Sequence, residues 1–113
     1  MHELSIALSI VDIAKEEAKK SNAETIKEIE LEIGKMSGVD KDALLFSLNI
    51  AMKNSVLDGA RIELKEIVPL AYCRACHNEY VPDTLFSACP KCHSYGSELI
   101  KGREMRVKSL LVE

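Results

Sequence analysis

The chain lacks most of the features that mark specialised classes of protein. It has no tryptophan, three prolines and five glycines among 113 residues. No apolar run approaches the roughly 18 residues of a membrane-spanning helix, so we expect no membrane segment. The first residues, Met1-His2-Glu3-Leu4, lack the basic and apolar regions of a signal peptide, which favours a cytoplasmic location.

An excess of positive charge is also missing. The formal net charge is −3, which argues against a generic nucleic-acid-binding protein. Apolar residues make up 47% of the chain and charged residues 29%. A chain of this length and composition can bury a hydrophobic core, and we expect a globular protein.

All four cysteines lie in the last third of the chain, as two Cys-x-x-Cys pairs. Cys73 and Cys76 form the first pair, Cys89 and Cys92 form the second, and twelve residues separate the pairs. Two such pairs supply the four thiolates that a structural Zn2+ ion takes in tetrahedral geometry. This spacing is typical of zinc sites, so we predict that the four cysteines bind zinc.

Other chemistries of paired cysteines fit less well. Two disulfides would suit a secreted chain, and a thioredoxin-like redox motif needs only one pair. A histidine follows each pair, at His77 and His93, and Cys-x-x-Cys-His is also the attachment string of c-type haem. Haem attachment would need an exported chain. Either histidine could instead replace a cysteine on zinc, and the sequence leaves that exchange open.

The segment around the cysteines carries little charge and most of the aromatic residues. Residues 70–103 have a formal charge of +1, which four thiolates and one Zn2+ turn to −1. Such a segment lacks the basic patch that phosphate binding requires. Because a small module has little apolar core, we expect its aromatic rings to pack around the metal. These aromatic residues are Tyr72, Tyr80, Phe86 and Tyr95.

The residues before the cysteines predict a small α/β unit. Apolar residues at spacings of three and four predict a helix over Glu3–Lys20. Its predicted apolar face comprises Leu4, Ala7, Leu8, Val11, Ala14 and Ala18. In residues 28–33, isoleucine and leucine alternate with glutamate, which indicates a half-buried strand with a charged outer face. Asp40 is a good N-cap for a second helix, and a second strand is predicted over residues 61–68.

The chain returns to strand after the cysteines. Over residues 104–112, Met105, Val107 and Ser109 alternate with Arg106, Lys108 and Leu110. We therefore predict an α+β fold, with two helices and a small mixed sheet, into which a zinc-ribbon-like module is inserted. Residues 1–69 together with 103–113 would form the α/β domain, and residues 70–102 the zinc-binding module.

The first three residues offer a second metal site. The Met1 α-amine, the His2 amide nitrogen and the His2 imidazole can close two chelate rings on one ion, with Glu3 as a further donor. This planar, nitrogen-rich set suits Ni2+ or Cu2+. Considered alone, however, a histidine near a chain terminus is usually a solvated residue.

Three segments together resemble the HypA/HybF family of hydrogenase maturation factors. They are Met1-His2-Glu3-Leu4-Ser5, the two cysteine pairs, and Gly102-Arg103-Glu104-Met105-Arg106, and they span the whole chain in that order. The resemblance implies a nickel metallochaperone that delivers Ni2+ to the [NiFe]-hydrogenase large subunit and in some organisms assists urease. It implies Met1, His2 and Glu3 as nickel ligands and Cys73, Cys76, Cys89 and Cys92 as zinc ligands.

The same resemblance implies a HypB-type GTPase as partner, with urease accessory proteins where urease is served. We expect a metal carrier with structural Zn2+ and transported Ni2+, no catalytic residues, and neither nucleic acid nor membrane as partner. Asp40 could approach the N-terminus, although helix capping is the simpler role for it. Two alternatives remain: a zinc-ribbon module that binds protein or nucleic acid without carrying nickel, and a thiol redox switch.

Overall fold

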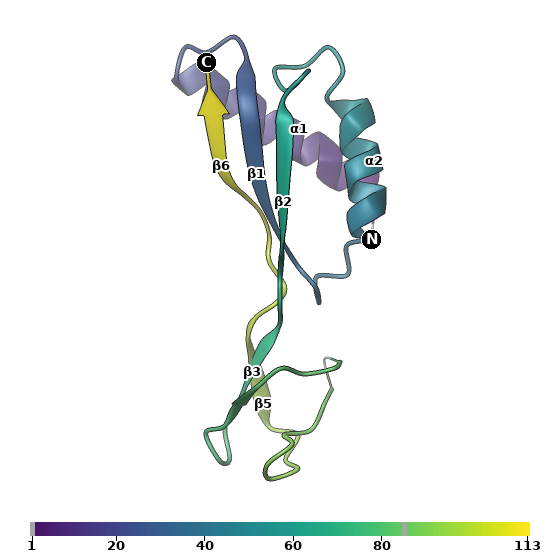
Figure 1. Cartoon of the computed structure of the whole chain (residues 1–113), viewed down its shortest axis with the longest axis vertical. Coiled ribbons are helices and arrows are strands. Elements are labelled where there is room, and N and C mark those ends of the chain that lie inside the picture. Colours follow the sequence, from purple (N-terminus) through teal and green to yellow (C-terminus); the bar gives the residue numbers. More distant parts are fainter. Residues whose placement is uncertain (1, 85) are drawn as a thin grey trace.

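The computed structural model describes residues 2–84 and 86–113, which form two units arranged end to end (Figure 1). The molecule measures 54 × 25 × 17 Å along its principal axes. In chain order, the described elements are α1 (Glu3–Lys20), β1 (Ile26–Gly34), α2 (Lys41–Ala51), β2 (Arg61–Ile67), β3 (Leu70–Cys73), β4 (Glu79–Tyr80), β5 (Ser97–Lys101) and β6 (Met105–Val112). None of the helices in the described residues is long and apolar enough to cross a membrane.

The larger unit is a mixed sheet with helices on one side. Its strands lie in the order β2-β1-β6, with β2 parallel and β6 antiparallel to β1. β2 leads into the smaller unit and β6 returns from it, so the cysteine-containing segment is inserted between two strands of one sheet, as predicted. In the part of the chain that the structure describes, no helix covers the other face of the sheet (Figure 1).

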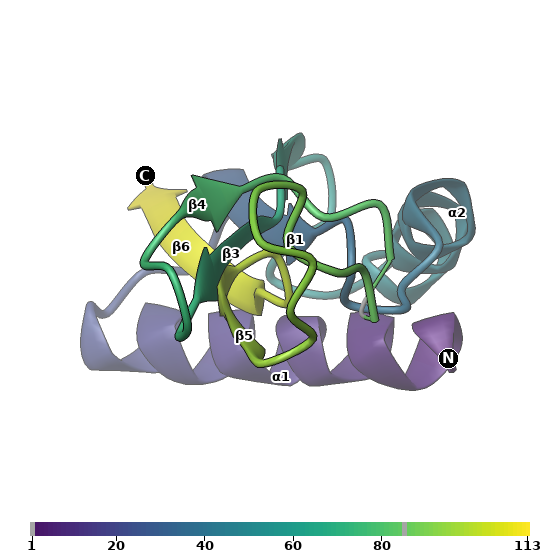
Figure 2. The ribbon, with the colours of Figure 1, turned by 90° about the horizontal axis from the view of Figure 1, so that it is seen from below.

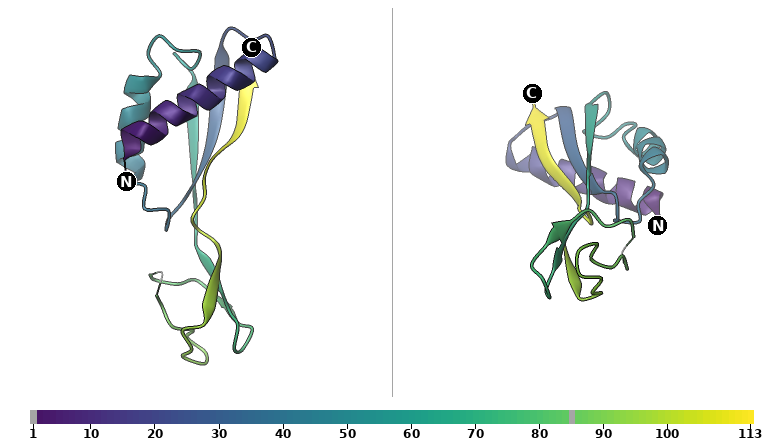
Figure 3. Two further views of the ribbon diagram at one scale, coloured as in Figure 1. Left: turned by 180° about the vertical axis from the view of Figure 1, so that it is seen from behind. Right: turned by 60° about the horizontal axis from the view of Figure 1, so that its bottom comes forward.

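Helix α1 crosses one face of this sheet diagonally, with α2 beside it (Figure 3, left). The core lies between α1, β1 and α2, and its buried members include Ala7, Ile10, Leu31 and Leu44. The predicted bounds of α1 are confirmed, but the centre of its apolar face is not. Leu4 and Leu8 are half exposed, and Ile10 is buried instead. Periodicity shows that a helix has an apolar side, whereas the packing partners decide which edge of that side is covered.

Strand β6 departs from the predicted alternation. Glu30 pairs with Ser109 and Leu31 with Val107, so Lys108 is an extra residue in the ladder. Such a bulge shifts the phase of a strand by one residue. Val107 and Leu110 therefore both pack against the core, and Ser109 lies on the opposite face, where its hydroxyl donates to Glu30 at 3.2 Å.

The smaller unit is built on a second sheet, in the order β4-β3-β5, and Figure 2 shows it from below. The hydrophobic core of this unit, among the described residues, comprises Ala71, Cys73, Tyr80 and Cys89. The expectation that all four aromatic rings pack around the metal is wrong for two of them. Phe86 is 83% exposed and Tyr95 78% exposed. The cysteine cluster itself, rather than a layer of rings, thus forms the centre of this unit.

Candidate metal sites

Two tight turns of similar geometry bring the cysteines together. In the first, the His77 amide donates to the Cys73 carbonyl at 2.8 Å, and in the second the His93 amide donates to the Cys89 carbonyl at 2.8 Å. Both histidines have a positive φ of 64°. A non-glycine residue in this left-handed region is uncommon, and histidine is among the types that tolerate it better. The histidine after each pair therefore closes a turn whose cysteine side chains converge.

The geometry of the cysteines fits a tetrahedral metal. All four sulfur atoms lie within 4.8 Å of one another. The Sγ atoms of Cys73 and Cys92 are 3.5 Å apart, and those of Cys76 and Cys89 are 3.6 Å apart. Four sulfurs bound to zinc at about 2.3 Å would be about 3.8 Å from one another. The four thiols could therefore hold a zinc ion with little change of position.

The ionisation of these thiols also suits a bound cation. Hydrogen bonding from the Cys76 backbone lowers the pKa of Cys73. Burial acts to raise the pKa of Cys89, but hydrogen bonds from the backbone N–H groups in its own turn and from the side chains of Cys76 and Asn78 together outweigh burial and lower the pKa to about 6. At Cys92 the Ser94 N–H acts to lower the pKa, but the other three cysteines and burial outweigh it and raise the pKa to about 12. A divalent cation would relieve this crowding of negative charge.

The histidines that follow the cysteines make different contacts. The Tyr72 hydroxyl is hydrogen-bonded to Nδ1 of His77. His93 is exposed, and so is Cys92 beside it. Asn78 donates from its side chain to the sulfur of Cys89 at 3.8 Å. These contacts do not test whether His77 or His93 can replace a cysteine on the metal, and that exchange stays a prediction.

The predicted nickel residues lie at the start of α1. His2 is the N-cap residue and is exposed, and its carbonyl accepts from the Ile6 amide at 3.1 Å. Glu3 begins the helix and is partly buried. Met1, the third predicted ligand, lies outside the described residues. Two of the three predicted residues are thus found at one helix terminus, with the His2 side chain open to solvent.

A contact between the starts of the two helices adds to this site. The backbone amide of Asp40 donates to Oε2 of Glu3 at 3.2 Å. The Asp40 side chain caps α2 by accepting from the Ala43 amide at 3.0 Å, so the predicted N-cap is confirmed. Asp40 therefore both caps α2 and approaches the N-terminus. The sequence held no signal for the contact with Glu3, because it uses a backbone group.

Comparison with known proteins bears on both sites. A family model described as "Hydrogenase/urease nickel incorporation, metallochaperone, hypA" matches residues 1–112. The chain is 44% identical over 113 residues to the hydrogenase maturation factor HypA of Parabacteroides distasonis, a match that covers all of this chain and 98% of the relative. It is 36% identical to the HypA of Chlorobium phaeobacteroides, with full coverage of both chains.

Solved structures show the same likeness. The solution structure of the nickel metallochaperone HypA from Helicobacter pylori has a TM-score of 0.72 at 29% identity, and covers 99% of this chain and 97% of that one. A second solution structure, of a HypA protein, has a TM-score of 0.74 at 29% identity, with coverage of 100% and 97%. Family model, sequence relatives and folds agree over the full length, and so the chain belongs to the HypA family of nickel metallochaperones for hydrogenase maturation.

Proposed function

We propose that the chain carries Ni2+ at its N-terminus, through the Met1 α-amine, the His2 imidazole and Glu3, for transfer to a [NiFe]-hydrogenase large subunit. The observation that carries this proposal is the exposed His2 at the N-cap of α1, next to a Glu3 that is tethered to α2. An exposed site with few protein ligands can release its metal to a partner more readily than a closed cage. The family description supports nickel as the cargo.

The start of a helix suits this chelate. The first N–H groups of an α-helix have no partner within the helix, so amide nitrogens there are free to lose a proton and bind metal. The positive end of the helix dipole stabilises negative charge on such a nitrogen. Deprotonated amides, an amine and an imidazole form the tetragonal nitrogen set that Ni2+ favours. Because binding must release protons, the affinity should fall as the pH is lowered.

The smaller unit takes a structural role in this proposal. Cys73, Cys76, Cys89 and Cys92 would hold Zn2+, which would fix residues 70–102 as a module distinct from a nickel-binding domain of residues 1–69 and 103–113. Zinc binding can supply the folding free energy that such a small core lacks. We infer that the chain acts in the cytoplasm as a carrier rather than an enzyme. Its partners would be a HypB-type GTPase, the hydrogenase large subunit and, where urease is served, urease accessory proteins.

A change at the N-terminus tests the nickel site most sharply. Extension by a few residues keeps every side chain but replaces the α-amine with a peptide bond, and His2→Ala removes the imidazole. Both variants should lose high-affinity nickel binding in a calorimetric titration, while zinc content and far-UV circular dichroism stay native. An extended chain that binds nickel as tightly as the native chain would refute the terminal chelate. The zinc-ribbon interaction module would then be the better proposal.

A further inference from the structure

The segment from the last residue of β1 to the N-cap of α2, residues 34–40, contacts both chain segments that join the two units. We call it the strap. The Lys35 amide donates to the Ile67 carbonyl at 3.0 Å, where β2 leaves the sheet for the smaller unit. The Met36 amide donates to the Gly102 carbonyl at 2.7 Å, where the chain returns. The start of the strap is therefore hydrogen-bonded to the outgoing and the returning segment.

The other end of the strap reaches the N-terminus. The Ser37 amide donates to the Gly34 carbonyl at 3.0 Å, and the Val39 amide donates to the Ser37 hydroxyl at 3.2 Å, so the strap is also bonded internally. Its last amide, that of Asp40, donates to the Glu3 carboxylate. Figure 1 shows this path, from the lower end of β1 back to the start of α2 beside the N-terminus.

The junction at the start of the strap is crowded, so the segments around Gly34 and Gly102 have little freedom to move relative to one another. A Cβ on Gly34 would lie 2.0 Å from the Gly102 carbonyl oxygen. A Cβ on Gly102 would lie 2.7 Å from both Cα and Cβ of Pro69. Gly102 also has a φ of 123°, which side chains rarely adopt. The Gly34 amide donates to the Glu104 carbonyl at 2.7 Å across this junction.

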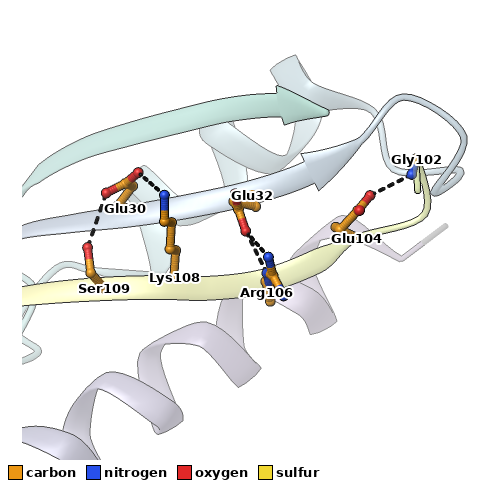
Figure 4. Close-up of polar contacts among 7 residues, drawn as sticks. All are labelled: Glu30, Glu32, Gly102, Glu104, Arg106, Lys108 and Ser109. Atoms are coloured by element: carbon orange, nitrogen blue, oxygen red, sulfur yellow. Dashed lines mark hydrogen bonds and ion pairs between the residues drawn. The ribbon is translucent and has the colours of Figure 1, made fainter. Parts of the chain in front are cut away.

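The Glu104 side chain fixes the returning chain at the same point. Its Oε1 accepts from the Gly102 amide at 2.8 Å, and this bond holds the turn that presents the Gly102 carbonyl to Met36 (Figure 4). The Glu104 side chain thus acts on the strap through Gly102, whereas its backbone carbonyl bonds Gly34 directly. The carboxylate can be removed without adding bulk at the crowded junction.

From these contacts we propose that the strap is a coupling element: it makes nickel affinity at the N-terminus depend on how the two units are held at the Gly34–Gly102 junction. The inference rests on the nickel site proposed above. The Glu3 carboxylate stays on the Asp40 amide and holds the first turn of α1 in place, so Glu3 offers nickel its amide nitrogen. A terminus ordered in advance binds metal at a lower entropic cost. A movement of the smaller unit that shifts Gly102 therefore loosens the first turn of α1 and weakens nickel binding. Because coupling between two sites is reciprocal, bound nickel in turn makes the junction more rigid.

Amide hydrogen exchange in the untagged, zinc-loaded chain tests the coupling without any substitution. Nickel should slow exchange at the Asp40, Met36 and Lys35 amides, and leave unchanged the amides at the opposite end of the sheet, such as Arg61. If nickel protects only the amides in the first turn of α1 and leaves the strap amides unaffected, the strap does not couple the nickel site to the junction. Faster exchange at Asp40 would mean that Glu3 leaves it to bind nickel, which also overturns the proposal.

Paired variants test whether a change at the junction alters nickel binding at the N-terminus. Glu104→Ala should weaken nickel binding by about fivefold or more, the low end of typical coupling. Glu104→Gln keeps an acceptor for Gly102 and should bind nickel as the native chain does. Gly102→Ala should weaken binding further. Its control is Gly59→Ala, where φ is also positive, at 80°, but an added Cβ meets nothing within 4 Å among the described residues.

The outcomes separate this proposal from the one before it. If the extended chain loses nickel binding but Glu104→Ala binds nickel like Glu104→Gln, the nickel site stands and the coupling is wrong. If the extended chain still binds nickel tightly, the terminal site is wrong and the coupling fails with it. Weakening by Gly59→Ala as strong as that by Gly102→Ala would assign the effect to general backbone strain.

Discussion

Arg106 on β6 binds the buried carboxylate of Glu32 on β1. Its Nε and Nη2 both lie 2.5 Å from Oε1 of Glu32, and Figure 4 shows the two side chains meeting between β1 and β6. Glu32 is only 5% exposed, although the alternating pattern placed it on the outer face of its strand. A buried carboxylate needs a charged or hydrogen-bonding partner, and here the partner comes from a residue 74 positions further along the chain.

Loss of this partner should destabilise the α/β domain. Arg106→Met leaves the Glu32 carboxylate buried without its donors, and we expect a loss of about 2 kcal/mol of unfolding free energy. Lys108→Met is the matched control, since Lys108 lies 3.6 Å from a more exposed Glu30, and it should cost at most about 0.5 kcal/mol. Urea denaturation followed by far-UV circular dichroism compares the two. Equal losses would show that the burial of Glu32 does not matter.

The cap of α2 offers a test of local stability. Asp40→Ala removes the oxygen that accepts from the Ala43 amide and should cost about 1 kcal/mol. Asp40→Asn keeps an acceptor at this position and should be nearly as stable as the native chain. Thermal denaturation of the zinc-loaded proteins measures both. If the two variants lose the same stability, charge rather than capping is the property that matters at this position.

Removal of one sulfur ligand should affect the smaller unit alone. Cys89→Ser should abolish stoichiometric zinc and unfold residues of about 70–101, because structural zinc contributes about 10–16 kcal/mol of apparent binding free energy in small modules. The resonances of α1 and β1 should keep their native dispersion in NMR spectra. His93→Asn, which retains a residue type that tolerates positive φ, should keep its zinc at neutral pH. If the zinc-free Cys89→Ser protein showed native NMR resonances for the smaller unit, a structural role for the metal would be contradicted.

The number of protons released when zinc binds should depend on how many of the four thiols are protonated beforehand. The pKa of Cys92 is raised to about 12 and that of Cys89 lowered to about 6. At pH 8 the Cys92 thiol is therefore protonated before zinc binds, whereas Cys89 is already ionised. Because zinc takes thiolates, at least one proton must leave on binding, and zinc affinity should rise with pH. Calorimetry in buffers of different ionisation enthalpy counts the protons. An uptake without proton release would show that all four cysteines are thiolates beforehand.

The sequence alone determined those features that depend on neighbouring residues. The spacing of apolar side chains gave α1 its observed bounds, Glu3–Lys20, and Asp40 was identified as an N-cap from its residue type. The two cysteine pairs at a spacing of two predicted a metal cluster, and their sulfurs do converge. In each case a few adjacent residues contain all the interactions that matter, so a local pattern is sufficient.

Only the tertiary structure decided how distant segments meet. The burial of Glu32 depends on Arg106, and the phase of β6 on an extra residue, Lys108, that no alternation pattern reveals. The contact of Glu3 with the Asp40 amide, and the crowding of Gly34 against Gly102, involve backbone groups that every residue type carries. Backbone contacts between remote segments leave no residue-type signal, because their geometry is set by how the whole sheet and its helices pack.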